Sequence, residues 1–69
     1  MSVTLYFGSN TDTMLATKAL RDVGVVARMI PTPAEIRAQA NLCLSIDDEH
    51  RIEALSAIQR ARVAIGGVA

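Results

Sequence analysis

Cys43 is the one cysteine of the chain and the residue with the greatest intrinsic reactivity. The thiolate is the reactive form of cysteine, and a neighbouring arginine lowers the pKa of a thiol. Arg28 and Arg62 are the candidates for that role if the topology brings them close to Cys43. The alternative is a small, inert strand residue without a chemical role, because free cysteine often behaves as a small buried hydrophobe.

The segment Ile30–Ile36 holds both prolines of the chain and separates two strand-like segments. Thr32 is a favourable helix N-cap, Pro33 suits the first helical position, and Glu35 completes a capping box. These signals predict a short helical turn over residues 34–38. A rigid entry into a surface turn is typical of a working loop, and the alternative is a simple connector between strands.

The other polar clusters do not form a catalytic or metal-binding set. His50 is predicted to face solvent in the first turn of a helix, with no nucleophile beside it. Asp47, Asp48 and Glu49 point in different directions at a helix start, which indicates a capped helix and not a Ca²⁺ or Mg²⁺ loop. One histidine and one cysteine cannot complete a tetrahedral zinc site. We therefore expect no metal site, and an enzyme is the less favoured class, although it stays open.

Length and composition favour a single small domain over residues 1–69 that has support from another chain. A domain of this size buries only about 60% of its unfolded surface, and 51% of the residues are hydrophobic. We therefore expect a protein partner, a homo-oligomer or both. Seven basic and seven acidic residues, with few aromatics, argue against nucleic-acid binding. No membrane span or secretory signal is visible, so a cytoplasmic location is expected.

Hydrophobic periodicity predicts six elements in the order strand, helix, strand, strand, helix, short strand. The strands are expected over residues 3–7, 25–30, 42–46 and 63–65, with Gly66 and Gly67 ending the last. The first helix is capped by Ser9 or Asn10 and ends at Gly24. Asp47-Asp48-Glu49 opens the second helix, which is capped by an aspartate. This order predicts an α+β, ferredoxin-like split βαβ fold, with a four-stranded antiparallel sheet covered by two helices on one face.

Alternation along the third strand assigns its residues to two faces of the sheet. Leu42, Leu44 and Ile46 are expected in the core, and Cys43 and Ser45 on the face without helices. The residues expected on that uncovered face are Thr4, Tyr6, Arg28, Cys43, Ser45 and Arg62. Together with Val26 and Ile30 they form a predicted docking surface.

Several short segments together carry a resemblance to a known family. They are Tyr6-Phe7-Gly8-Ser9, the helix with Ala16, Lys18, Ala19 and Leu20, the pair Gly24-Val25, the run Arg28–Pro33, Glu35-Ile36, and Leu42 with Leu44. On these features the chain resembles the selenium/sulfur carrier protein-like family over nearly its whole length. The combination is more specific than any one segment.

The resemblance implies a carrier function that rests on a Cys-Gly pair just after the short turn. In this sequence Ala40 and Asn41 hold those two positions, and Ala34 replaces the arginine that follows the second proline. Cys43 stands three residues beyond the usual thiol, at a position where the family has a small residue. The resemblance therefore leaves two outcomes open, a carrier thiol that has moved or one that has been lost.

The leading hypothesis is a non-catalytic accessory domain that docks on a partner through the uncovered sheet face and the loop. The loop residues expected to take part are Pro31, Thr32, Pro33, Glu35, Ala40 and Asn41. No cofactor is expected, apart from sulfur or selenium carried on Cys43 as a persulfide or its selenium analogue. The alternative hypothesis is a small-molecule-binding regulatory module that acts as a homo-oligomer.

Overall fold

The computed structural model of the chain describes residues 1–36 and 39–69. Within these residues, strands and helices follow one another in the predicted order. Their bounds are β1 Ser2–Phe7, α1 Asn10–Asp22, β2 Ala27–Pro31, β3 Leu42–Asp47, α2 Arg51–Arg60 and β4 Ile65–Val68. A single 3₁₀ turn, η1, spans Asp48–His50 and leads into α2. In the part of the chain that is described, no helix has the length and apolarity needed to cross a membrane.

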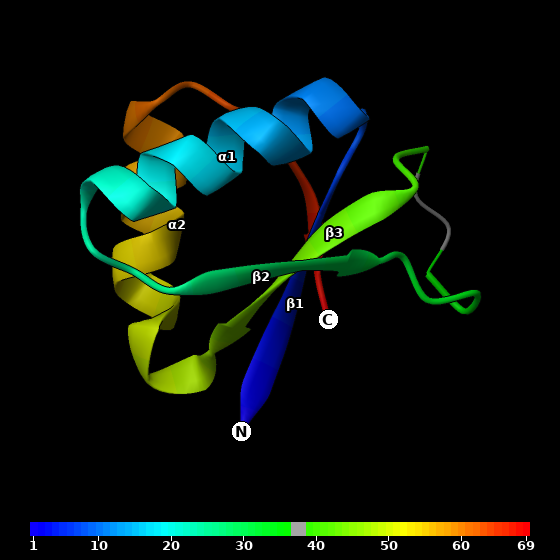
Figure 1. Cartoon of the computed structure of the whole chain (residues 1–69), viewed down its shortest axis with the longest axis horizontal. Coiled ribbons are helices and arrows are strands. Elements are labelled where there is room, and N and C mark those ends of the chain that lie inside the picture. The colour runs from blue at the N-terminus through cyan, green and yellow to red at the C-terminus, as the bar shows by residue number, and fades with distance from the viewer. Residues whose placement is uncertain (37–38) are drawn as a thin grey trace.

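The strands form one antiparallel sheet in the order β2-β3-β1-β4 (Figure 1). The central pair is β1 with β3, as the predicted topology requires, and Leu5 lies opposite Leu44 in that pair. The outer pair of β2 with β3 places Ile30 opposite Cys43. The predicted α+β fold of ferredoxin-like order is therefore confirmed.

The core lies between the sheet and the two helices. It combines alternate residues of the central strands with the inward faces of α1 and α2, because a strand presents every second side chain to the same face. The buried residues of this cluster are Val3, Leu5, Phe7, Ala16, Leu20, Val25, Leu44, Ile46, Ala54, Ala57, Ile58 and Val63. The predicted inward face of β1 is confirmed, and Leu44 and Ile46 confirm the register of β3.

Helix α1 begins and ends as its sequence predicts. The Ser9 hydroxyl accepts a hydrogen bond of 3.1 Å from the backbone N–H of Asp12, which caps the helix. At the other end Gly24 has φ +77°, a conformation that glycine adopts without steric cost. The N–H of Val25 then donates to the Leu20 carbonyl and that of Gly24 to the Arg21 carbonyl, forming a Schellman motif.

The start of α2 differs from the prediction of an aspartate cap. Asp47 occupies the N-cap position of η1, but its side chain makes no capping hydrogen bond. Its carboxylate lies 3.9 Å from the ammonium of Met1, and both groups are largely exposed. The Asp48 N–H donates to the carbonyl of Met1, the residue before β1, at 2.9 Å. This backbone acceptor satisfies a donor at the helix start that a capping side chain would otherwise have bound.

Helix α2 ends in a second Schellman motif, in which Arg62 takes the position that glycine usually holds. The Val63 N–H donates to the Ile58 carbonyl and the Arg62 N–H to the Gln59 carbonyl. Arg62 has φ +60°, a left-handed conformation that costs a residue with a Cβ roughly 1–2 kcal/mol.

Replacing Arg62 with glycine is therefore expected to raise the free energy of unfolding by about 0.5–1 kcal/mol. Urea denaturation followed by circular dichroism measures this change. The matched control is Arg60→Gly, inside the last turn of α2, which is expected to lower stability by about 1 kcal/mol. A loss of stability in Arg62→Gly would contradict the strain argument.

The last strand differs most from its prediction, because β4 contains the two glycines that were expected to end it. Tyr6 pairs with Gly67 and Phe7 with Ile65, so Gly66 is an extra residue that forms a bulge. A Cβ on Gly67 would overlap the phenol of Tyr6, which means that the Tyr6 ring lies over this glycine. The Tyr6 ring covers the backbone that Gly67, without a side chain, would leave exposed. The strand therefore forms although glycine has a low strand propensity.

Candidate functional site

The loop between β2 and β3 is closed at its base by hydrogen bonds that extend the strand ladder. The Thr32 N–H donates to the Asn41 carbonyl at 2.8 Å. The Thr32 hydroxyl donates to the Ala40 carbonyl at 2.9 Å. The prediction of Thr32 as a helix N-cap is wrong, because no helix begins in residues 33–36 and the Thr32 hydroxyl donates to the Ala40 carbonyl.

The described part of the loop beyond Thr32 contains one reverse turn. The Ile36 N–H donates to the Pro33 carbonyl at 3.0 Å, which closes the turn around Ala34 and Glu35. Glu35 is exposed at its tip. The predicted helical turn over residues 34–38 thus begins as a turn, and its last two positions lie outside the described residues.

Two polar residues of α1 hold the end of the loop against the helix. The Asn10 side-chain oxygen accepts hydrogen bonds from the N–H groups of Asn41 at 3.0 Å and Leu42 at 3.3 Å. The Thr13 hydroxyl lies 3.0 Å from the Leu42 carbonyl and 3.2 Å from the Ser9 carbonyl. Neither residue was predicted to contact the loop. Thr13 stands three and seven positions before Ala16 and Leu20, so helical periodicity could have identified it as a buried polar residue.

Cys43 lies on the face of the sheet opposite the helices, but its side chain is completely buried. Its neighbour Leu44 belongs to the core cluster, while Cys43 does not, in agreement with the predicted alternation. The thiol is 0% exposed, and its sulfur lies 3.8 Å from the Pro31 carbonyl oxygen. Ile30 pairs with Cys43 across β2 and β3. The predicted face is therefore right, but a thiol presented to solvent is not what the structure shows.

We use the term open face for the side of the sheet that carries no helix. Strand pairing and alternation place these side chains on it: Ser2, Thr4, Tyr6, Arg28, Ile30, Cys43, Ser45 and Asp47. Arg28 lies directly opposite Ser45, and Tyr6 lies over Gly67 at the far side. Arg62 was expected here and is not, because it lies in the turn that follows α2. Of the two arginines considered for the thiol, only Arg28 therefore shares its face.

A hollow of about 530 Å³ lies at one end of the open face. Arg28, Ser45 and Asp47 line it from the sheet, and exposed Val26 adds an apolar wall. His50 lines its other side, with its ring nitrogens 3.5 Å and 3.6 Å from Glu49 and Glu53 oxygens. The hollow therefore offers positive, negative, hydroxyl and apolar groups within one surface region.

The described groups do not assemble into a recognisable reaction centre. Cys43 is sealed in the sheet, and its one hydrogen-bond partner among the described residues is the Pro31 carbonyl, which cannot act as a general base. Residues 1–36 and 39–69 contain no cluster of three or more histidine, cysteine, aspartate or glutamate residues suited to a metal ion.

Comparison with known proteins supports the resemblance seen in the sequence. Neither the curated proteins nor the solved structures provide a match to this chain. A family model described as "Putative Se/S carrier protein-like" matches residues 2–69, which is nearly the whole length. The match includes the loop, the open face and both helices, and the chain belongs to the Se/S carrier protein-like family.

Proposed function

We propose that this chain is a non-catalytic docking domain, which binds a partner protein through its open face and the Pro31–Asn41 loop. The observation that carries the proposal is the sheet face that both helices leave bare, since the whole core cluster lies on the other face. An uncovered sheet face with mixed apolar and polar side chains is suited to contact with another protein surface.

The chemistry of the open face supports a partner of mixed character. Val26 is 79% exposed beside Arg28, and the hollow next to them holds both charged and hydroxyl groups. An apolar contact on Val26 would supply affinity, and the charge of Arg28 would select a carboxylate on the partner.

The loop supports the proposal because its base is fixed before any partner arrives. Thr32 and Asn10 bind the backbone of residues 40–42 from two sides. A preorganised loop loses little conformational freedom on binding, so more of the contact energy is available as affinity. Pro31, Glu35 and Asn41 are exposed in the described part of the loop, so their side chains can contact a partner.

The burial of Cys43 supports docking without a carrier thiol on the surface. A persulfide on this residue would place a second sulfur in a site where the first has no accessible surface. The usual thiol position of the family is held by Ala40, which is itself buried and has no nucleophilic atom. Docking is therefore the part of the family's carrier-like role that this chain is best suited to perform.

The test is affinity purification of the tagged chain from its own cells, comparing wild type with two charge-reversed variants. Arg28→Glu alters the open face, and Arg21→Glu makes the same charge change on the exposed side of α1. We expect a co-purifying protein to be lost with Arg28→Glu and kept with Arg21→Glu. Equal recovery with both variants would overturn docking through the open face.

Intact mass spectrometry of the same native sample tests the carrier alternative directly. An unmodified chain is expected with and without reductant. An adduct of about 32 Da for sulfur or about 79 Da for selenium, removed by reductant, would instead assign the carrier chemistry to Cys43.

A further inference from the structure

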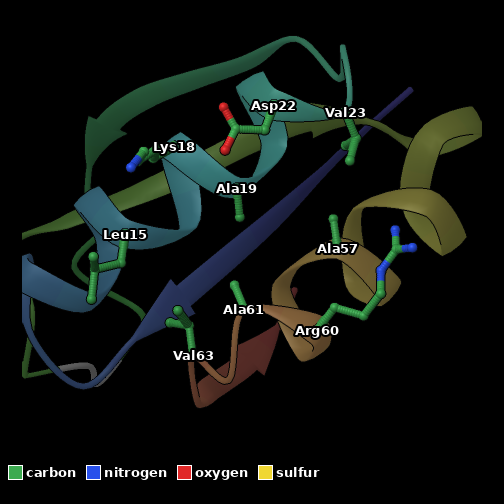
Figure 2. Close-up of a pocket in the computed structure, with 9 residues that line it drawn as sticks. All are labelled: Leu15, Lys18, Ala19, Asp22, Val23, Ala57, Arg60, Ala61 and Val63. Atoms are coloured by element: carbon green, nitrogen blue, oxygen red, sulfur yellow. The ribbon is translucent and has the colours of Figure 1, made fainter.

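A second surface feature lies on the outer side of the helical layer, away from the open face. It is a groove of about 410 Å³ between α1 and α2. Figure 2 shows its lining side chains, which come from α1 and its end on one side and from α2 and the following turn on the other. We call this surface the helix groove, lined by Leu15, Lys18, Ala19, Asp22, Val23, Ala57, Arg60, Ala61 and Val63.

The helix groove carries both projecting and recessed apolar residues. Leu15 and Val23 remain 50% and 45% exposed, although both are large aliphatic side chains. Between them the lining consists of the alanines 19, 57 and 61, whose single methyl groups leave room for a neighbour. A surface with its own projections and recesses can pack against a copy of itself, because an isologous interface uses the same patch on both sides.

The charges around the groove have the same self-complementary character. Lys18 and Asp22 lie on α1, and Arg60 lies on α2, all three exposed at the groove. A patch that contains both signs can satisfy its own charges across a twofold axis, whereas a patch of one sign would repel its copy. In the described part of the chain, none of these three residues belongs to an ion pair within 4.0 Å.

We propose that the helix groove is the contact surface of a homodimer, in which Leu15 and Val23 of each copy pack into the alanine-lined recess of the other. Asp22 of one copy faces the Lys18 and Arg60 cations of its partner. The size of the chain supports this arrangement, since small domains are commonly stabilised by association. The open face stays free in such a dimer, so the inference is independent of the proposed docking function.

The test uses two variants of the full chain with opposite charge patterns. Asp22→Lys leaves three cations on the groove, and the double variant Lys18→Glu with Arg60→Glu leaves three anions. Each variant alone is expected to raise the dimer dissociation constant at least about tenfold, because an isologous interface loses every attractive pair twice. Mixing the two variants is expected to give a heterodimer, because the cations of one groove then face the anions of the other. This holds whichever residues form the closest ion pairs. Sedimentation velocity and native mass spectrometry measure both effects.

Further variants show whether a loss of dimerisation comes from the helix groove, from another surface or from unfolding. Asp22→Lys places a cation in the last turn of α1, which favours the helix, so unfolding does not explain its effect. Ala19→Glu, which fills the recess with a carboxylate, is expected to abolish dimerisation. Glu35→Lys makes a charge reversal on the loop and is expected to leave dimerisation unchanged.

Three results with the wild type and the groove variants would overturn the proposal. They are a wild-type chain that stays monomeric from micromolar to millimolar concentration, an Asp22→Lys variant that dimerises as well as wild type, and the absence of a heterodimer on mixing. Disruption by Glu35→Lys would also overturn it, by placing the contact at the loop. Arg28→Glu leaves this dimer intact, so failure of the docking function and failure of the dimer are distinguished.

Discussion

Cys43 in the folded protein is expected to react with a thiol reagent at least about a hundredfold more slowly than in the denatured chain. The side chain is 0% exposed in the centre of the sheet, so the reagent reaches the sulfur only when β3 opens. An opening free energy of about 2.8 kcal/mol suffices for this protection, because each 1.4 kcal/mol changes an equilibrium tenfold. Opening β3 breaks its pairing with both β1 and β2, so we expect the opening free energy to be at least this large.

The measurement compares labelling rates in buffer and in concentrated urea, at one pH and one reagent concentration. The matched control moves the single thiol two residues, in a chain that carries Cys43→Ala and Asn41→Cys. Asn41 is exposed and takes part in the loop base through its backbone, so its replacement keeps those hydrogen bonds. The control thiol is expected to react at similar rates in both solutions. Equal rates for Cys43 itself would contradict its burial.

The result bears directly on the two outcomes that the family resemblance leaves open. A protected thiol means that transfer of sulfur to Cys43 would require the central strand to open at every cycle. A readily labelled thiol would favour a carrier thiol that has moved to Cys43. The rate of labelling therefore separates a docking domain from a carrier without knowledge of the partner.

The sheet was predictable because its information is local and periodic. Alternation in β1 and β3 assigned Leu5, Phe7 and Leu44 to the core, and the structure places them there. The order of elements then restricted the topology, since two helices cover one face of a four-stranded sheet. The ends of α1 were equally local, because Ser9 and Gly24 act on groups a few residues away.

The features that the sequence did not reveal depend on contacts between distant segments. Gly66 and Gly67 have low strand propensity, but β1 pairs with their backbone and the Tyr6 ring covers Gly67. Thr32 has the sequence signature of a helix cap, but its N–H donates to the carbonyl of Asn41, nine residues later.

In the candidate site, too, the features set by neighbouring residues were predicted and those set by distant segments were not. Alternation assigned Cys43, Ser45 and Tyr6 to the correct face, but depth of burial depends on the neighbouring strand and not on periodicity. The polar anchors of the loop come from α1, about thirty residues earlier in the chain. A pattern within the loop could not identify Asn10 and Thr13 as its supports.

Replacing Phe7 with alanine is expected to lower the free energy of unfolding by about 3–5 kcal/mol. Phe7 is fully buried, and its removal leaves a cavity between the sheet and both helices. A domain of this length is stable by roughly 3–10 kcal/mol in total, so the change consumes much or all of its stability. Urea denaturation followed by circular dichroism, with wild type beside it, measures the loss.

The matched control is Met14→Ala, which removes a side chain of similar size from the exposed side of α1. Met14 is 61% exposed, so we expect a change within about 0.5 kcal/mol. If Phe7→Ala cost no more than Met14→Ala, the assignment of the core face of β1 would be wrong, and a one-residue shift would move Tyr6 into the core instead.

The Phe7 variant also connects the core to the docking surface. Phe7 and Tyr6 are adjacent in β1 and face opposite sides, so loss of the core contact loosens the strand that carries Tyr6 on the open face. A partner that binds only the folded chain would restore about 2.7 kcal/mol at a concentration one hundred times its dissociation constant. The variant is therefore expected to have a much lower urea midpoint than wild type, and a true partner is expected to raise that midpoint. A protein that does not bind the folded chain would leave the midpoint unchanged.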